Sequence, residues 1–419
     1  MKKRFQTRYT VVLYTFSLTI LLYIDRICIS AAKEPITSAL NLNDKQFGWV
    51  LSAFALGYAL FQTPSGLLLD KKGPRTVITM IVSAWSLLTA FTGLAWNFIS
   101  LLVIRFFFGA GEAGAFPGIS KSSISWFPVK ERGLVTGINF SGSRLGAAFA
   151  MPFVIFLINS LGWRNSFYFL GFIGVAWAVL WYRWFRDTPE EHTSVSAEEL
   201  DHIIEHRQQI DKKNEQSVSW LQMMKSKEVW FTMIQYFSSN YIFFFCLTWL
   251  FPFLRDKYQM DDATLSYWVS MPFLAGALGN YFSGFLVDYL YKNKGIIISR
   301  RLPAIIGFAF IAMGLIANIQ ADSIYTSIAF LSLAIFGADM TLSPSWSYCM
   351  DVGKENAGVL SGTMNMAGNL GSFLTALAFP YLMSWTGDEN AFFYMGIALA
   401  FIAIFCWTQM NPEKSSIEQ

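Results

Sequence analysis

Six ionisable side chains stand inside stretches of the sequence that are otherwise apolar. Three are acids and three are arginines: Asp25, Glu112, Asp339, Arg26, Arg105 and Arg144. A carboxyl group can take up and release a proton, and a guanidinium can bind a carboxylate through two parallel hydrogen bonds. An ionisable group at the centre of a bilayer costs about 2.5–3.5 kcal/mol on insertion scales, so such groups persist where they pair or perform a task. Carboxyl and guanidinium groups in such places could therefore exchange protons and bind an anion, or pair with each other between helices.

The spacing of these residues predicts how they point. Arg105 and Glu112 are seven residues apart, which is two helical turns, so they share one face about 10 Å apart along the axis. Asp25 and Arg26 are neighbours and point roughly 100° apart on a helix. One of the two can face a polar space while the other turns toward a neighbouring helix.

A structural interpretation of the charges remains open, because ion pairs can also hold membrane helices together. It is strongest for Arg105, since Gly109, Gly111 and Gly114 predict tight packing of the same span. We expect Arg105 and Asp339 to act as supporting ion-pair residues.

The elements that carry these residues are predicted to be membrane-spanning helices. The chain has 419 residues, of which 54% are hydrophobic and only 14% charged, against about 25% charged in soluble proteins. Its small net charge of +3 does not favour nucleic-acid binding. Twelve apolar runs are long enough to span a bilayer; they cover about 10–32, 47–69, 76–96, 98–122, 133–160, 165–186, 228–254, 263–291, 302–320, 323–349, 356–384 and 390–410.

The loops between these runs predict an orientation. An even number of spans places both termini on one side, and that side carries 22 Lys and Arg residues against 5 on the other. Because cytoplasmic loops are enriched in Lys and Arg, both termini are predicted to be cytoplasmic in a multi-pass protein of the cell's inner (plasma) membrane. We expect the protein to be a monomer whose partners are the lipid bilayer, protons and a small organic anion.

One long hydrophilic segment divides the chain into an N-terminal six-helix half (1–186), a cytoplasmic linker (187–227) and a C-terminal six-helix half (228–419). Within the linker, Ser196 and Glu199 have the spacing of a capping box and predict a helix. His202 and His206 lie one turn apart, but without a third ligand we favour a solvated face over a metal site. The four cysteines fall in apolar runs and are expected to be core residues. We expect no metal and no cofactor.

A repeated motif links the two halves. GLLLDKKGPR, which ends span 2, is echoed by GFLVDYLYKNKG at the end of span 8. Here the sequence resembles the major facilitator superfamily, whose hallmark is GxLxDxxGxR between spans 2 and 3. The resemblance implies an all-α fold of two six-helix halves around a midplane site, and a transporter rather than an enzyme. The residues expected to serve in conformational change are Gly66, Asp70, Gly73 and Arg75.

A closer resemblance rests on other stretches. YIDR, SAFALGYALFQTPSGLLLD, RFFFGAGEAGAFPG, WFPVKERG and GWRNSFYFLG cover nearly the whole N-terminal half. They are similar to the anion:cation symporter family, which includes hexuronate, galactonate and glucarate transporters and sialins. The resemblance implies that Arg26 binds the substrate carboxylate and that Asp25 and Glu112 carry protons. Tyr23 and Tyr58 would then bond sugar hydroxyls.

Further polar residues are substrate-binding candidates or helix-bridging residues, and the residue pattern leaves both uses open. Asn365 and Asn369 are four residues apart, so they share one face of span 11. The remaining candidates are Gln62, one turn beyond Tyr58, and Ser343 and Trp346, beside the kink expected at Pro344.

Arg144 and Asp339 depart from what the family resemblance implies, because a small or amide residue is common at the first position and a mid-helix acid is uncommon at the second. One interpretation is that they pair with each other. Alternatively, Arg144 binds a second carboxylate, which would favour an aldarate such as glucarate.

The sequence as a whole predicts a proton-coupled symporter of organic anions, most of all sugar acids such as hexuronates, aldonates or aldarates, with alternating access. A sodium-coupled porter, an anion exchanger and a membrane sensor are the alternatives. An intramembrane aspartyl protease using Asp339 is disfavoured, because Asp351 lies at the membrane border and the repeated halves would be unexplained.

Overall fold

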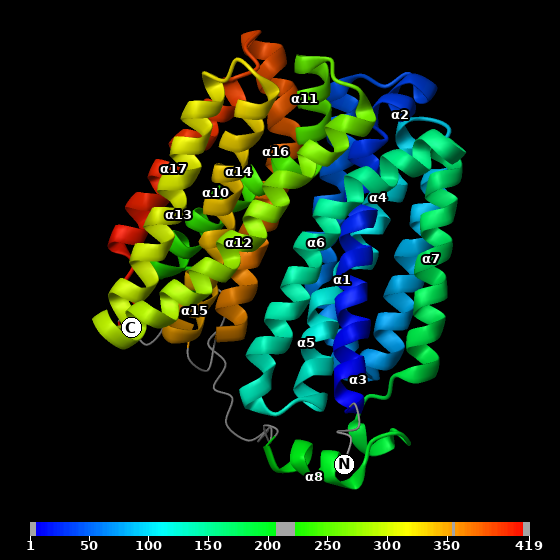
Figure 1. The fold of residues 1–419 in the computed structure, drawn as a ribbon, viewed down its shortest axis with the longest axis vertical. Coiled ribbons are helices and arrows are strands. Elements are labelled where there is room, and N and C mark those ends of the chain that lie inside the picture. The colour runs from blue at the N-terminus through cyan, green and yellow to red at the C-terminus, as the bar shows by residue number, and fades with distance from the viewer. Residues whose placement is uncertain (1–5, 207–222, 354–356, 414–419) are drawn as a thin grey trace. The chain divides into compact units, whose positions relative to one another are not determined.

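The computed structural model describes residues 6–206, 223–353 and 357–413, and that part of the chain contains helices and no strands. The chain divides into two compact units, which contain residues 1–42 with 53–212, and residues 43–52 with 213–419. In the first unit the elements are α1 (Thr7–Ala31), α2 (Lys33–Leu40), most of α3 (Asp44–Thr92), α4 (Phe98–Glu112), α5 (Ala115–Trp126), α6 (Val129–Leu161), α7 (Trp163–Trp184), η1 (Pro189–Glu191) and α8 (Ala197–His206) (Figure 1). In the second they are α10 (Lys227–Thr248), α11 (Leu250–Tyr258), α12 (Asp262–Lys294), α13 (Ile296–Ile319), α14 (Ile324–Met340), α15 (Leu342–Gly353), α16 (Ala357–Thr386) and α17 (Ala391–Gln409).

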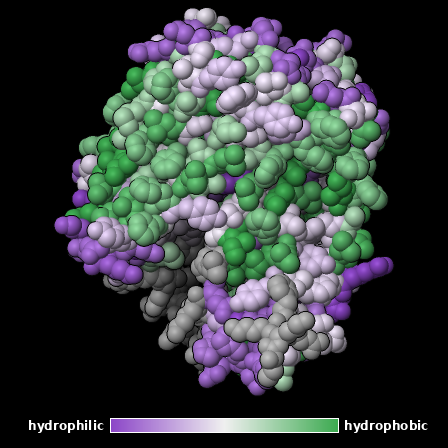
Figure 2. Space-filling view, in the orientation of Figure 1, coloured by the Kyte–Doolittle hydropathy of each residue, from purple (hydrophilic) through white to green (hydrophobic). Residues whose placement is uncertain are grey.

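The helices correspond to the twelve predicted spans. By length and hydropathy, eight described segments could cross a membrane, and the bent pair of α10 and α11 makes up to nine. The first part of α3, α12 and α16 account for the other three predicted spans. In each unit, hydrophobic residues cover the middle of the helices and hydrophilic residues gather at their ends (Figure 2). This distribution suits helices that lie in a bilayer.

Local sequence signals explain where several helices begin. Asn97 caps α4 by accepting a hydrogen bond from the backbone N–H of Ser100, whose side chain bonds back in a capping box. Ser323 and Thr326 form the same arrangement at the start of α14. Such caps satisfy the unpaired N–H groups of the first helical turn. They set the boundaries of the spans that carry Arg105, Glu112 and Asp339.

Spans 2 and 3 are joined in α3 by a break at Gly73. This glycine has φ of +75°, a conformation that glycine adopts without steric cost. A Cβ atom there would also lie 2.6 Å from an oxygen of the Asp187 carboxylate. Pro74 then begins the second half of the helix, a position that proline tolerates because its missing N–H needs no partner.

The first turns of α3, residues 44–52, belong to the second unit. The side chain of Ser52 donates a hydrogen bond to the Phe373 carbonyl at 2.9 Å, and the Trp49 indole donates to the Tyr381 hydroxyl at 3.2 Å. A Cβ on Gly48 would lie 2.8 Å from the Ala376 carbonyl oxygen. The start of α3 therefore lies directly on α16.

The linker begins with a helix, α8, as the sequence predicts. The Ser196 hydroxyl accepts a hydrogen bond from the backbone N–H of Glu199 at 3.2 Å, which is one half of the predicted capping box. The Glu199 carboxylate instead binds the start of α1. Residues 207–222 and the loop lysines Lys354 and Lys414 lie outside the described residues.

Candidate functional site

The two neighbouring charges of α1 have different surroundings. Asp25 is completely buried. The Arg26 side chain is 12% exposed, and its Nε lies 2.6 Å from Oε2 of Glu112 on α4. Arg26 therefore pairs with an acid from another helix rather than with its own neighbour. This agrees with the divergence of about 100° between consecutive helical side chains.

Three aromatic rings surround the Arg26 guanidinium. Its central carbon lies 5.2 Å from the Tyr23 and Phe54 ring centroids and 4.9 Å from that of Tyr58. Such rings attract a cation through their negative faces, and they exclude water from the pair with Glu112. In the described part of the structure, Nη2 of Arg26 has no hydrogen-bond acceptor. One arm of the guanidinium fork thus remains available for a second acceptor.

Asp25 is buried without the hydrogen bonds that a carboxylate needs. Neither of its carboxylate oxygens accepts a hydrogen bond from any residue that the structure describes. The side chains that act on it electrostatically are Glu112, the Trp85 indole and Arg105, and the Trp85 N–H lies near it without reaching hydrogen-bond geometry. A buried carboxylate without hydrogen bonds is costly, whereas a carboxylic acid is tolerated. The site therefore suits a carboxyl group that exchanges a proton.

Glycines bring α4 close enough to complete this cluster. A Cβ on Gly109 would collide with the Phe54 carbonyl oxygen of α3. A Cβ on Gly111 would lie 3.2 Å from the Cβ of Trp85, and one on Gly114 would lie 3.0 Å from the Cβ of Ser65. The prediction that these glycines mark tight packing of span 4 is confirmed. The close contact of α4 with α3 places Glu112 within ion-pair distance of Arg26.

Arg105 lies on the same helix two turns before Glu112. Its guanidinium carbon stands 4.2 Å from the Phe108 ring centroid and 5.4 Å from that of Phe54. No ion-pair contact joins Arg105 to Glu112 among the described residues. Arg105 acts on both Asp25 and Glu112 through space. It is thus a neighbouring positive charge for both acids.

Arg144 joins the cluster from α6. It is buried, and its Nη1 donates a hydrogen bond to the Tyr23 hydroxyl at 3.3 Å. Tyr23 therefore contacts two guanidinium groups, with its ring beside Arg26 and its hydroxyl bonded to Arg144. Helix α6 approaches α1 closely here, since a Cβ on Gly146 would lie 2.8 Å from the Ile20 backbone.

Among the other candidate residues, Gln62 belongs to the first unit and the rest belong to the second unit. Gln62 is partly exposed on α3. In the second unit, Asp339 is buried on α14 with its carboxylate against Gly276 of α12. Its predicted pairing with Arg144 stays a prediction, because the two residues belong to different units.

The remaining candidates of the second unit lie on α15 and α16. The Asn369 amide donates to the Asn365 carbonyl at 3.0 Å, which places both on one face as predicted. The Trp346 ring lies 6.4 Å from that of Tyr236. Ser343 is partly exposed one residue into α15, which begins after a break at Thr341 rather than at Pro344.

The motif residues have distinct environments. A Cβ added to Gly66 would meet no atom within 4 Å, and the Asp70 side chain lies outside the described part. Gly73 forms the break in α3. The Arg75 backbone N–H donates to the Asp187 carboxylate at 2.7 Å, and its guanidinium carbon stands 4.5 Å from the Tyr182 ring centroid.

Sequence reasoning missed several contributors. Trp85 stands in an apolar run with no polar neighbour to mark it, and Phe54 looks like any core aromatic residue. Lys121, near the end of span 4, is a further charged residue to which the sequence pattern assigns no role; its Nζ donates to the Leu69 carbonyl at 3.0 Å. In the second unit, Asn240 lies against Gly368, and its spacing of four residues from Tyr236 was a usable signal.

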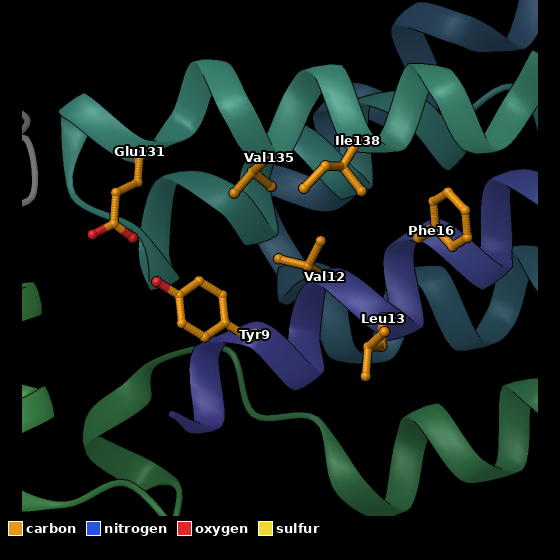
Figure 3. A pocket seen from close by; sticks show the side chains of 7 residues that line it. All are labelled: Tyr9, Val12, Leu13, Phe16, Glu131, Val135 and Ile138. Atoms are coloured by element: carbon orange, nitrogen blue, oxygen red, sulfur yellow. The ribbon is translucent and has the colours of Figure 1, made fainter. Parts of the chain in front are cut away.

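A groove of about 510 Å³ lies between α1 and α6 but does not include Arg26. The Tyr9 hydroxyl and the Glu131 carboxylate stand at its polar end (Figure 3). Its other lining residues are apolar: Val12, Leu13, Phe16, Val135 and Ile138. It therefore offers no guanidinium for an anion.

Metal and disulfide chemistry find no support in the described residues. They contain no group of three or more His, Cys, Asp or Glu side chains placed to hold a metal ion. All four cysteines are buried with unpaired thiols, as expected for core residues.

Comparison with known proteins identifies the class. The profile of the Major Facilitator Superfamily matches residues 15–376. The chain is 30% identical to a probable sulfoacetate transporter of Cupriavidus necator (98% of this chain, 96% of the relative), and 30% identical to a hexuronate transporter of Bacillus subtilis (94% and 92%). It is also 30% identical to a probable galactarate/D-glucarate transporter of Escherichia coli (97% and 95%).

Solved structures agree on the fold. A bacterial homologue of the human lysosomal transporter Spinster, in an inward-facing and unoccupied conformation, superimposes with a TM-score of 0.73 at 20% identity over 96% of this chain and 93% of that one. A D-xylose–proton symporter gives 0.75 at 14% identity over 97% and 99%. The expected all-α fold of twelve membrane helices and the expectation that the chain is no enzyme are both confirmed. The chain belongs to the major facilitator superfamily, and it is a multi-pass membrane transporter whose relatives are named for small organic anions.

Proposed function

We propose that this chain moves a sugar acid or a similar organic anion together with protons by alternating access. The observation that carries the proposal is the buried ion pair of Arg26 with Glu112, with Asp25 beside it. A guanidinium binds a protein carboxylate and a substrate carboxylate in the same geometry. Glu112 is therefore a competitor of the substrate for Arg26, and a proton on Glu112 removes the competitor.

The charge balance of the buried cluster in the first unit supports the same direction of coupling. With both acids ionised, the three guanidinium groups of Arg26, Arg105 and Arg144 exceed the carboxylates of Asp25 and Glu112 by one positive charge. With both acids protonated, the excess is three. Since the interaction of charges strengthens in a low-dielectric site, the protonated form binds an anion more tightly. This difference in affinity is the thermodynamic requirement for coupling.

The proposed cycle follows from these states. Asp25 and Glu112 take up protons from the outside, and Arg26 leaves Glu112 and binds the substrate carboxylate. The two halves then change access. Release of the protons inside restores the pair between Arg26 and Glu112, which displaces the anion.

Arg144 suggests the length of the substrate. Its guanidinium donates to the hydroxyl of Tyr23, whose ring lies beside Arg26, so a sugar acid with a carboxylate at each end could engage both guanidinium groups. This arrangement favours an aldarate, while Tyr23 and Tyr58 would bond hydroxyl groups. The names of the relatives, which include hexuronate and galactarate/D-glucarate, fit this chemical class.

The Lys and Arg residues of the loops support an orientation of the protein in the membrane. With 22 Lys and Arg residues on the side of both termini against 5 on the other, the termini and α8 would be cytoplasmic in the inner (plasma) membrane. We propose that the protein acts as a monomer.

Uptake into vesicles tests the proposal. Glucuronate, galacturonate, galactonate, glucarate and tartrate would be offered with a proton gradient, and again after an ionophore has dissipated it. We expect accumulation of at least one acid that the ionophore abolishes. Accumulation that needs a sodium gradient would point to a sodium-coupled porter, and strict one-for-one exchange to an anion exchanger. No movement of any acid would favour a sensor.

A further inference from the structure

The segment from Arg186 to His206, which we call the collar, packs against one end of the first unit. The Trp126 indole donates a hydrogen bond to the Arg186 carbonyl at 2.9 Å. The His192 ring lies between Trp126 and Trp184, with ring centroids 5.5 and 4.8 Å away. Ile203 of α8 is completely buried. The collar is therefore a packed part of this unit, and α8 lies beside the N-terminal end of α1 (Figure 1).

The collar caps α1. The helix begins at Thr7, and the preceding Gln6 makes no side-chain cap. The two oxygens of Glu199 accept hydrogen bonds from the backbone N–H groups of Thr7 and Arg8 at 3.0 and 2.9 Å. The Thr7 hydroxyl also donates to the Ser194 carbonyl at 2.9 Å. A carboxylate satisfies the unpaired N–H groups of a first turn and matches the positive end of the helix dipole.

The collar also caps the second half of α3. After the break at Gly73, the first N–H available for capping belongs to Arg75, and it binds the Asp187 carboxylate at 2.7 Å. Gly73 leaves no space for a Cβ beside that carboxylate. The Arg75 Nε meanwhile donates to the Tyr182 carbonyl at 3.0 Å. One segment thus supplies acidic caps to two helix starts that lie far apart in the sequence.

A third helix start is tied to α1 and to the collar. Glu131, in the first turn of α6, accepts a hydrogen bond from Nη2 of Arg8 at 3.1 Å. The same carboxylate oxygen lies 3.6 Å from Nε2 of His202 on α8. The starts of α1, of the second half of α3 and of α6 therefore meet at the collar.

These three helices carry the part of the charged cluster that faces α4, together with Trp85. Asp25 and Arg26 stand on α1, Trp85 on the second half of α3, and Arg144 on α6. A continuous helix transmits an axial shift along its length, and Asp25 stands about 27 Å from Thr7 at a rise of 1.5 Å per residue. An axial shift of α1 at its capped end would thus change the positions of Asp25 and Arg26 along the helix axis relative to Glu112 on α4.

We infer that the collar is a positioning device and that Glu199 is a positioning residue, which holds α1 in register so that Arg26 and Asp25 meet the groups of α3 and α4. The inference rests on the proposed function for its effect on coupling. Glu199 touches neither substrate nor the reacting carboxyl groups. The first part of the linker is therefore a packed part of the first unit and not a flexible connection.

The test compares Glu199→Ala and Glu199→Gln in the full-length protein with the control Glu198→Ala, whose side chain is exposed on the same helix. Amide hydrogen exchange is measured over residues 7–12. Register is measured by maleimide labelling of Cys28, which is buried one turn after Asp25, with the other three cysteines replaced by alanine. We expect Glu199→Ala to exchange at least tenfold faster and to label severalfold faster, and Glu198→Ala to behave like the parent.

Transport supplies the third measurement. For D-glucuronate in vesicles, Glu199→Ala should raise the half-saturating concentration severalfold and reduce pH-driven accumulation, with Glu199→Gln in between. Unchanged amide exchange, or faster exchange with unchanged Cys28 labelling, would overturn the positioning role. If Glu199→Ala does not fold, Glu199→Gln is judged by the same criteria. If the parent takes up no D-glucuronate, the proposed function fails for this acid, while exchange and labelling still decide the positioning role.

Discussion

Removing the charge of Glu112 separates proton coupling from substrate binding. Glu112→Gln keeps the shape of the side chain but leaves Arg26 without its anion, 2.6 Å from the former carboxylate oxygen. Because breaking a buried ion pair by removing one partner costs about 3–5 kcal/mol, the substrate-free variant should lose free energy of unfolding of that order. A bound carboxylate supplies a new partner for Arg26 and should recover much of the loss.

This reasoning gives a magnitude for ligand stabilisation. If substrate restores about 3 kcal/mol that the wild type already has through Glu112, the variant should bind it roughly 100-fold more tightly than the wild type does at a pH where Glu112 is ionised, since each 1.4 kcal/mol is tenfold. The assay is thermal unfolding of purified protein over a series of D-glucuronate concentrations. Glu205→Gln, at an exposed position of α8, is the matched control.

Transport by Glu112→Gln should divide into two outcomes. Downhill exchange of labelled substrate needs only the loaded carrier to reorient, so it should survive. Accumulation driven by a pH gradient should vanish, because the variant cannot release the proton that completes the cycle. Normal accumulation would refute the coupling role. An equal loss of exchange, accumulation and folded protein would instead support a structural role.

Arg26→Lys keeps the charge but loses the paired donors of the guanidinium, so uptake should fall at least tenfold at normal folded yield; wild-type uptake would remove Arg26 as the substrate anchor. Cysteines introduced near Glu205 and near Asp388 should react with impermeant reagents from opposite sides of the membrane, and labelling from one side would contradict the twelve-span topology. Desolvation lowers the pKa of His192 from its ordinary value of 6.5, so as the pH falls the imidazole of the unfolded chain is protonated before that of the folded protein. The neutral, buried His192 therefore contributes its full stabilisation above about pH 6.5, and this stabilisation is lost as the pH falls further. Thermal unfolding of His192→Phe should lack this acid sensitivity. Gly109→Ala places a methyl group against a backbone carbonyl, and overpacking of this kind should cost about 1–3 kcal/mol in denaturation measurements; an unchanged midpoint would show that α3 and α4 can separate freely.

Patterns along the chain were sufficient for the features that belong to single helices. Apolar runs predicted the spans, because a bilayer allows little else to cross it. Glycines at positions 109, 111 and 114 predicted close packing of span 4, since only small residues let two backbones approach. The divergence of Asp25 from Arg26 followed from the rotation of 100° per residue. Each of these inferences needs only the geometry of one helix.

Partners on different helices could not be read in this way. The sequence placed Arg105 and Glu112 on one face, yet the structure joins Glu112 to Arg26 of α1. The spacing of Ser196 and Glu199 predicted a capping box, yet the Glu199 carboxylate caps α1, 191 residues away in sequence from its partner Arg8. No sequence pattern distinguished Trp85 from other core aromatic residues, because its role in the site depends only on its position beside Asp25.

The sequence by itself determined that this protein is a bundle of membrane helices with six charges that need partners, and it determined the direction of each side chain within its own helix. Only the tertiary structure decided which charges meet. That choice depends on the rotation and axial height of one helix against another, and these are set by the sum of many small packing contacts and by caps such as Glu199. No spacing within a single helix encodes that sum, because the period of a helix is the same whichever neighbour it faces.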